Sequence, residues 1–209
     1  MKKKIVSLCL CVALLAVAVI GGTLAYFTDT QDVTNTFSFS KNVTITLDEN
    51  DNTKDDGSRT ETGNDYKDIY PSQTVTKDPI VHVADDSADC YVRAFVTVNN
   101  KAALDAIFAK NGYALTDVIG GHSEKWAYVS VKVVGDTRVY ELRYTEVLEA
   151  EDDTEAIFLT VTFPADLTEE QITTLEDLSI VVKAEAVQSA GFEDYTAAWT
   201  AIDAETAAE

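Results

Sequence analysis

The stretch that decides the fold class reads Val92-Arg93-Ala94-Phe95-Val96-Thr97-Val98. Apolar residues stand at positions 92, 94, 96 and 98, and Arg93 and Thr97 lie between them. This period of two is the pattern of a β-strand that turns one face toward a core. The stretch 43–47 repeats the pattern, because Thr44 and Thr46 separate three apolar residues. The sequence therefore predicts a protein built from half-buried strands.

Further strands are expected where similar runs recur. The segments are 34–40, 75–83, 126–134, 138–144, 156–163 and 178–187. Between two of them stand Gly135 and Asp136, a pair that suits the tight turn of a β-hairpin. Pro79 lies inside 75–83, and proline cannot donate a backbone hydrogen bond. We therefore expect that strand at a sheet edge or at a bulge.

Two short helices are expected between strands. Residues 101–110 have apolar side chains at helical spacing, with Asn100 as the N-cap and Gly112 as the stop. Residues 168–175 begin with Thr168-Glu169-Glu170-Gln171, the pattern of a capping box. Both sequences thus predict elements of only two or three turns.

A weaker helical pattern covers residues 195–204 near the end of the chain. Trp199 and Ile202 are its expected inward-facing residues. Many short strands with few helices predict an all-β protein, an antiparallel β-sandwich whose ends are capped by these two or three short helices.

The first 25 residues have the composition of an export signal. Residues 2–4 are lysines, residues 5–20 are continuously apolar, and residues 21–25 bring small side chains near a cleavage point. The alternative is an uncleaved anchor, because residues 5–25 are just long enough to span a bilayer. No second apolar stretch of that length follows, so this segment is the expected membrane contact.

Cleavage would change the charge of the chain. Thr23 and Ala25 take the positions that a signal peptidase reads, which makes Tyr26 the first residue of the mature chain. The whole chain of 209 residues has a net charge of -20; removing residues 1–25 takes away three lysines and leaves 13 basic and 36 acidic residues, or -23. Nucleic-acid binding is excluded, because it needs Lys and Arg to displace phosphate counterions.

The cysteine and histidine inventory offers no catalytic motif. Cys90 is the one cysteine after residue 25, and we interpret it as a small strand residue rather than a reactive thiol. His82 lies in an expected strand and His122 in a Gly-rich turn, without the spacing of a zinc protease. We interpret both as strand or surface histidines, and the sequence gives no positive sign of an enzyme.

Residues 48–68 form a polar, acidic interval without apolar periodicity. The simplest interpretation is a long exposed loop. The functional alternative is a calcium site, because carboxylate oxygens are the ligands that Ca²⁺ prefers. The candidate ligands are Asp48, Asp51, Asp55 and Asp56. Their spacing does not match an EF-hand, and no other cofactor is expected.

Several sequence features occur together: a cleavage site, an aromatic-Thr-Asp start of the mature chain, a first strand, and matching segments further on. They are Gly21-Gly22-Thr23-Leu24-Ala25-Tyr26-Phe27-Thr28-Asp29-Thr30, Asn35-Thr36-Phe37, and the stretches 43–47, 70–79, 90–94, 186–192 and 198–199. The combination resembles the SipW-dependent signal region and later strands of the TasA/camelysin family. It touches both ends of the chain, while the middle matches only by strand pattern.

That resemblance implies a secreted, jelly-roll β-sandwich of Gram-positive bacteria that is cleaved by a dedicated signal peptidase and assembled into extracellular matrix or biofilm fibres. In such fibres a released N-terminal segment adds as a strand to the next subunit. Here that segment is 26–40, in which Tyr26, Phe27, Phe37 and Phe39 are the expected anchors. The alternative leaves the segment paired as a strand of its own sandwich.

The resemblance also implies a second activity, since camelysin-type members are described as cell-surface metalloendopeptidases. No zinc motif is present in this sequence to carry that activity. The leading hypothesis is therefore a secreted structural subunit that associates with itself or with related matrix subunits. The metalloendopeptidase is the alternative.

Overall fold

The computed structural model describes residues 42–109 and 113–207. Several predictions lie outside these residues: the signal segment 1–25 with Thr23 and Ala25, the segment 26–40 with Tyr26, Phe27, Phe37 and Phe39, and the helix stop at Gly112. Within the two described ranges, no helix combines the length and the apolar character that a membrane span requires.

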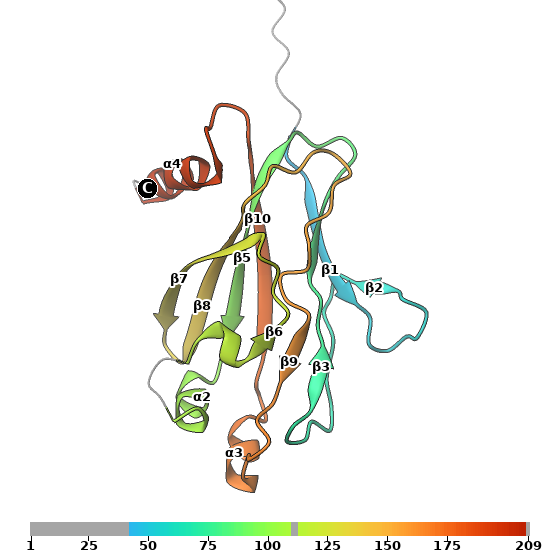
Figure 1. Ribbon diagram of the computed structural model, residues 1–209, viewed down its shortest axis with the longest axis vertical. Coiled ribbons are helices and arrows are strands. Elements are labelled where there is room, and N and C mark those ends of the chain that lie inside the picture. The colour runs from blue at the N-terminus through green and yellow to red at the C-terminus, as the bar shows by residue number, and fades with distance from the viewer. Residues whose placement is uncertain (1–41, 110–112, 208–209) are drawn as a thin grey trace, which may run out of the picture. The chain divides into compact units, whose positions relative to one another are not determined.

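The described residues form ten strands and three short α-helices (Figure 1). The strands are β1 (Ile45–Asn50), β2 (Arg59–Thr60), β3 (Thr74–Thr76), β4 (Ile80–Val83), β5 (Cys90–Val98), β6 (Ile119–Gly120), β7 (Trp126–Val134), β8 (Thr137–Tyr144), β9 (Thr160–Thr162) and β10 (Ile180–Gln188). The helices are α2 (Lys101–Ile107), α3 (Glu169–Thr174) and α4 (Tyr195–Thr206), with a 3-10 turn, η1, at Leu115–Asp117.

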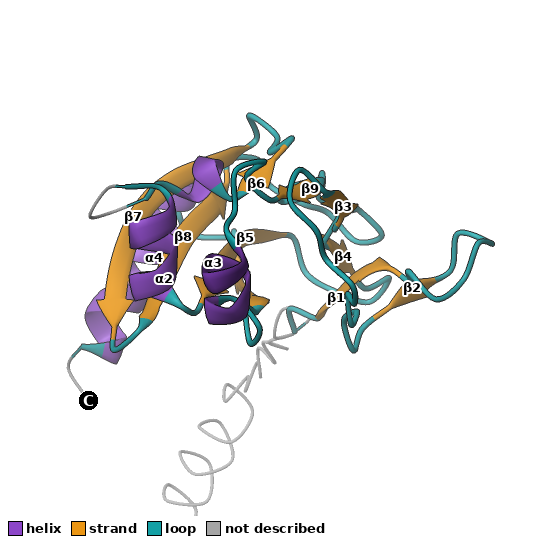
Figure 2. Cartoon of the chain, turned by 90° about the horizontal axis from the view of Figure 1, so that it is seen from below, coloured by secondary structure: helices purple, strands orange, loops and turns teal. Residues whose placement is uncertain are grey.

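Every strand pair in the described residues is antiparallel. The strand orders are β10-β5-β8-β7 in a four-stranded sheet, and β2-β1-β4 and β3-β9-β6 in two three-stranded sheets. Figure 2 shows β5, β8 and β7 on one side and β1, β4, β3 and β9 on the other. The prediction of an all-β protein with antiparallel sheets and a few short helices is confirmed.

Strand β5 is the centre of the core. Its alternate residues, Val92, Ala94, Val96 and Val98, are completely buried, as the period of two predicts. Cys90 is also completely buried in this strand, and burial raises the pKa of its thiol to about 11. The interpretation of Cys90 as a small strand residue is therefore confirmed.

The hairpin between β7 and β8 is also confirmed. Val134 pairs with Thr137, and Gly135 between them has a φ of 59°, a conformation that glycine adopts without steric cost. A bulge between Tyr128 and Ser130 interrupts the ladder.

The segment 75–83 is not one strand, and this prediction is corrected. The chain leaves β3 after Thr76 and enters β4 at Ile80. Between them, Lys77 donates its backbone N–H to Leu159, and the carboxylate of Asp78 accepts from the backbone N–H of Asn50. Pro79, which cannot donate, sits at the break between two sheets.

Two other predicted boundaries change. Of the segment 156–163, only Thr160–Thr162 is a strand. The interval 48–68 is not wholly a loop, because β1 continues to Asn50 and pairs there with Arg59 of β2. The polar interval therefore begins with a short hairpin in which β2 pairs with the end of β1.

The three predicted helices form, with two differences at the first, which ends at Ile107 and not at the predicted residue 110. Asn100 precedes α2 in a left-handed conformation and its side chain does not cap the helix; instead its amide donates to the carbonyl of Thr174. Thr168 and Gln171 form the predicted capping box of α3.

Helix α4 packs on the outer face of the four-stranded sheet rather than at an end. Trp199 is buried against Tyr91 of β5 and the half-buried Val187 of β10. The guanidinium of Arg93 lies 4.3 Å from the centre of the Trp199 ring and pairs with Asp203 at 2.5 Å. The helix thereby shields an arginine on the sheet surface.

Candidate functional site

The candidate site is a groove between β1 and β10, two strands that each have an open edge. Within the described residues, β10 pairs only with β5, so its opposite edge has no partner strand. β1 pairs with β4 along Ile45–Asp48, but on its other side only Glu49 and Asn50 pair, with β2. Backbone N–H and C=O groups at such edges can accept another strand.

The groove encloses about 1340 Å³ and is continued by a smaller hollow of about 390 Å³. Leu47 of β1 and Ile180 and Val182 of β10 line the large part; Val43 and Ala184 line the hollow. The two spaces therefore follow almost the full length of β10.

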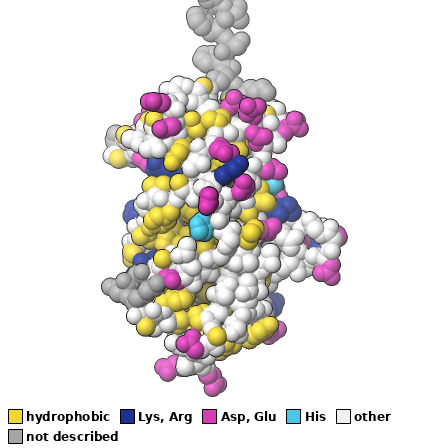
Figure 3. Space-filling model, in the orientation of Figure 1, with side chains coloured by type: hydrophobic (Ala, Val, Ile, Leu, Met, Phe, Trp, Pro, Cys, Tyr) yellow, Lys and Arg dark blue, Asp and Glu magenta, His cyan; other side chains and the backbone are white. Residues whose placement is uncertain are grey.

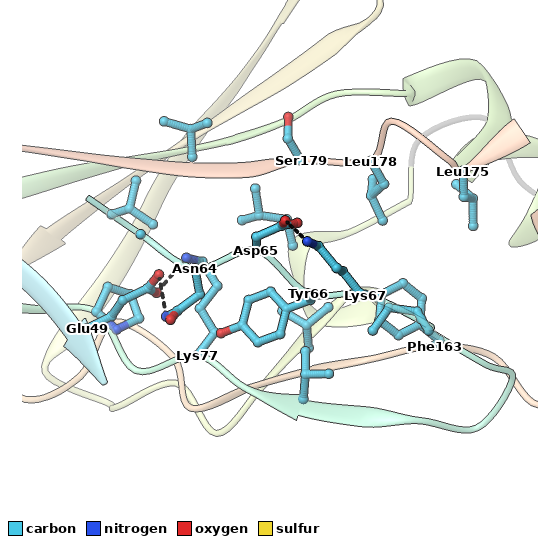
Figure 4. A pocket seen from close by; sticks show the side chains of 18 of the residues that line it. Glu49, Asn64, Asp65, Tyr66, Lys67, Lys77, Phe163, Leu175, Leu178 and Ser179 are labelled. Atoms are coloured by element: carbon cyan, nitrogen blue, oxygen red, sulfur yellow. Dashed lines mark hydrogen bonds and ion pairs between the residues drawn. The ribbon is translucent and has the colours of Figure 1, made fainter. Parts of the chain in front are cut away.

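The groove has an apolar part and a polar part: the polar lining residues lie mostly in the loop 60–68, and the apolar ones lie mostly on β10 and in the segment 161–178. In Figure 4, Leu175 and Leu178 project into it from one side, and Tyr66 and Phe163 lie on the opposite side. Such a surface suits the alternate side chains of an extended peptide, because apolar walls bury the side chains while the open edges pair with the backbone.

The inner face of β10 is incompletely covered. Ile180, Val182, Ala184 and Ala186 are only partly buried. Their paired partners on β5, which are Val98, Val96, Ala94 and Val92 in the same order, have no exposure at all. Because the two strands are adjacent and share this face, the difference arises from the space beside β10, where a neighbouring strand is absent from the described residues.

One end of the groove carries a polar cluster around a buried carboxylate. Glu49 is 4% exposed. Its carboxylate forms an ion pair with Lys77 at 2.6 Å and accepts a hydrogen bond from the amide of Asn64 at 3.1 Å. The hydroxyl of Tyr66 donates to the carbonyl of Thr76 at 2.6 Å. Burial and the negative charge of Glu49 raise the pKa of Tyr66 to about 12, so its proton stays in place.

This polar cluster is satisfied by its own neighbours. Each of the groups named above has a partner in the loop or in β1 and β3, which is the usual state of buried polar groups. It therefore closes the groove at one end and fixes the loop that carries Asn64 and Tyr66.

A second cluster joins three residues that are distant in sequence. The Nε2 atom of His82 lies 2.9 Å from Asp48, and its Nδ1 atom lies 2.6 Å from Asp153. Burial alone would lower the pKa of His82, but hydrogen bonds and charge from the two aspartates outweigh it and raise the pKa above its ordinary value. His82 is thus a strand histidine that clamps β1 to β4, while His122 is an exposed surface residue.

Asp48 also binds Arg59, whose Nε atom lies 2.5 Å from its carboxylate. Arg59 contacts Asp78 at 3.1 Å in turn. Burial works to raise the pKa of Asp48, but the bonds from His82 and Arg59 lower it below its ordinary value.

The four calcium candidates have different partners and do not form one site. Asp48 serves the cluster above; Asp51 accepts hydrogen bonds from Thr53, which together with Lys54 lower its pKa to about 2. Asp56 bonds Ser58, and Asp55 is exposed. Among residues 42–109 and 113–207, no group of three or more His, Cys, Asp or Glu side chains could hold a metal ion.

Sequence reasoning missed the groove and the His82 clamp. Alternation predicted apolar faces for β1 and β10, but it does not tell which strands end up at an edge. The clamp residues are separated by 34 and 71 positions, so no local motif announces them.

Comparison of the chain with models of protein families, with curated proteins and with solved structures finds no match. Its function must therefore be inferred from its own geometry. The groove offers apolar side chains and unpaired backbone groups, which are the means of binding an extended peptide.

Proposed function

We propose that this protein is a secreted structural subunit that assembles when the N-terminal segment 26–40 of one copy adds as a strand to the groove of the next copy. The observation that carries the proposal is the open groove between β1 and β10, with its half-buried apolar residues Ile180 and Val182. An inserted strand would pair with the edge of β10 and cover that face.

The dimensions of the segment are compatible with the groove. An extended chain rises about 3.3 Å per residue, so residues 26–40 span about 50 Å and the nine residues of β10 about 30 Å. Phe37 and Phe39 are two residues apart, so both would point to the same face of an added strand. The segment is therefore long enough to fill the groove and has apolar residues at a suitable spacing.

The proposal includes a jelly-roll-like β-sandwich, which the added strand would complete by joining the edges of β1 and β10. It also includes export by the segment 1–25, removal of that segment by a signal peptidase before Tyr26, and a location in the extracellular matrix or at the surface of a Gram-positive-type bacterium. N-terminal sequencing of the extracellular protein tests the cut. No observation in the described residues favours the metalloendopeptidase alternative.

A mixing experiment tests strand addition between copies. In the chain that starts at Tyr26, Phe37→Ala with Phe39→Ala removes the anchors of the donor segment, whereas Val182→Arg places a charge in the acceptor groove. Each variant alone should remain monomeric in sedimentation velocity, and the unaltered chain should form larger species. A mixture of the two should form a one-to-one complex, because the donor variant keeps its groove and the acceptor variant keeps its segment.

Matched variants control for charge and composition. Thr36→Ala with Ser38→Ala changes the other face of the segment, and Val147→Arg adds the same charge at an exposed loop position. Both should assemble like the unaltered chain. A mixture that stays monomeric would show that the segment pairs within its own chain, and an unaltered chain that is monomeric at every concentration would overturn the proposal.

A further inference from the structure

Strand β7, at the other edge of the four-stranded sheet, has an unusual surface. It pairs with β8 alone among the described residues, so its outer edge is open. Five of its nine residues are large apolar residues with exposed side chains, and they are Tyr128, Val129, Val131, Val133 and Val134. Figure 3 shows hydrophobic side chains on the flank where β7 runs in Figure 1.

The charge of β7 sets it apart from the rest of this acidic chain. It contains no Asp or Glu and one basic residue, Lys132, in a protein with a net charge of -20. Lys132 is exposed and has no ion-pair partner among the residues that the structure describes. The net negative charge opposes contact between two copies of the chain, and β7 adds no negative side chain to that repulsion.

We propose that β7 pairs antiparallel with β7 of a second copy of this chain, with Val131 of the two copies opposite each other on the two-fold axis. In this register Lys132 of each copy faces Ser130 of the other. A register one residue further along would place two Lys132 side chains opposite each other, which is unfavourable.

The chosen register also gives Lys132 a partner. Ser130 pairs with Glu141 of β8, and its hydroxyl donates to a carboxylate oxygen of Glu141 at 3.3 Å. Strands lie about 4.8 Å apart, so Glu141 of the second copy would be about 10 Å from the backbone of Lys132, within reach of the two long side chains. This complementarity identifies a second copy as the occupant of the β7 edge.

The bulge between Tyr128 and Ser130 limits the contact to the part of β7 that follows it. Bulges and edge lysines are common protection against unlimited edge-to-edge pairing. Here they restrict the pairing to one register and one partner, so the contact closes as a dimer. No residue of β7 lines the groove or the hollow, so a flat strand edge fits β7 better than a segment with deep anchors.

Disulfide trapping tests the register. Val131→Cys in the chain that starts at Tyr26 should cross-link to itself under mild oxidation, because Cβ atoms of directly opposed residues lie about 4.5–5.5 Å apart. Val147→Cys is the matched control, since Val147 is 43% exposed and Val131 is 42% exposed. The native Cys90 is completely buried and contributes no background. Val147→Cys should remain monomeric.

A charge variant and a combined variant complete the test. Lys132→Glu should abolish the cross-link when added to Val131→Cys, whereas Lys54→Glu, which changes the net charge equally but in a loop outside β7, should leave it intact. Adding Phe37→Ala and Phe39→Ala should also leave it intact, which separates this contact from strand addition. Equal cross-linking at positions 131 and 147, or none at 131 in a chain whose circular dichroism is native, would overturn the proposal.

Discussion

The two edges of the four-stranded sheet, β10 and β7, differ in what surrounds them. Beside β10 lies a groove with a second wall formed by β1, and the inner residues of β10 are half-buried. β7 lines neither the groove nor the hollow, and its apolar residues such as Tyr128, at 57% exposure, face the solvent. An edge with a groove can receive a strand with its side chains, whereas an edge without one can only meet another flat edge.

The outer face of the sheet repeats this asymmetry. Helix α4 packs with Trp199 on Tyr91 and Arg93 of β5, and its Asp203 reaches Arg143 of β8 at 3.1 Å. The outer side chains of β7 have no such cover among the described residues. The half of the sheet beside the groove is thus supported from behind. We expect that support to matter for the stability of the groove more than any residue of β7.

The largest effect should follow from removing that support. Trp199→Ala should lower the free energy of unfolding by about 3 kcal/mol, because a completely buried indole is lost and a cavity remains. Its Nε1 atom has no hydrogen-bond partner among the described residues, so the loss is one of packing and of the contact with Arg93. Urea unfolding measures it. A loss below that of Ile172→Ala, an exposed position in α3, would contradict the packing argument.

An intermediate effect should distinguish two residues that face each other in the ladder. Val96 and Val182 are paired, but Val96 is completely buried and Val182 only partly. In the monomer, Val96→Ala should lower the free energy of unfolding by about 2 kcal/mol and Val182→Ala by roughly 1 kcal/mol. The cost at Val182 is smaller because this side chain, at the groove, buries less apolar area on folding.

In assembled protein the stability losses caused by Val96→Ala and Val182→Ala should become similar, since the added strand would bury Val182. Thermal unfolding of monomeric and assembled samples makes this comparison. If Val182→Ala costs the same in both states, then the groove is not where the strand is added.

The smallest effect should come from the clamp behind the β1 wall. His82 has a raised pKa when folded, so its contribution to stability is fully present below its ordinary value of about 6.5 and is lost as the pH rises through the raised pKa. Asp48 has a lowered pKa and needs only to stay ionised, which holds in this window.

Urea midpoints measured from pH 6 to pH 9 should therefore fall on the alkaline side. His82→Gln should flatten this dependence, and the corresponding change at the exposed His122 should leave it unchanged. A midpoint that rises over this pH range would contradict the clamp.

The sequence predicted the elements whose signals are local. The alternation at Val92–Val98 marks β5, Gly135 marks the hairpin, and Thr168 with Gln171 marks α3, because each depends on neighbours in the chain. The edges were not predictable in this way. The valines of β7 have the same period of two as those of β5, and only the absence of a covering layer makes them surface residues.

The candidate site was out of reach of sequence reasoning for the same reason. Its walls come from strands about 130 residues apart in the chain, and the interruption at Lys77 that separates β3 from β4 is held by tertiary hydrogen bonds. What the sequence did indicate was the proposed donor, the segment with Phe37 and Phe39. Donor and acceptor thus came from different kinds of observation.

The burial of Cys90 gives the chain after residue 25 a built-in reporter of its own conformation. Its single thiol lies in the centre of the molecule, and burial raises its pKa to about 11, so a thiol reagent cannot reach it or find a thiolate in the native state. Only molecules that have opened β5 will react. The rate of thiol labelling therefore measures how often β5 opens, without any engineered probe. If the protein assembles as proposed, a lower labelling rate in the assembled sample would show that assembly slows this opening.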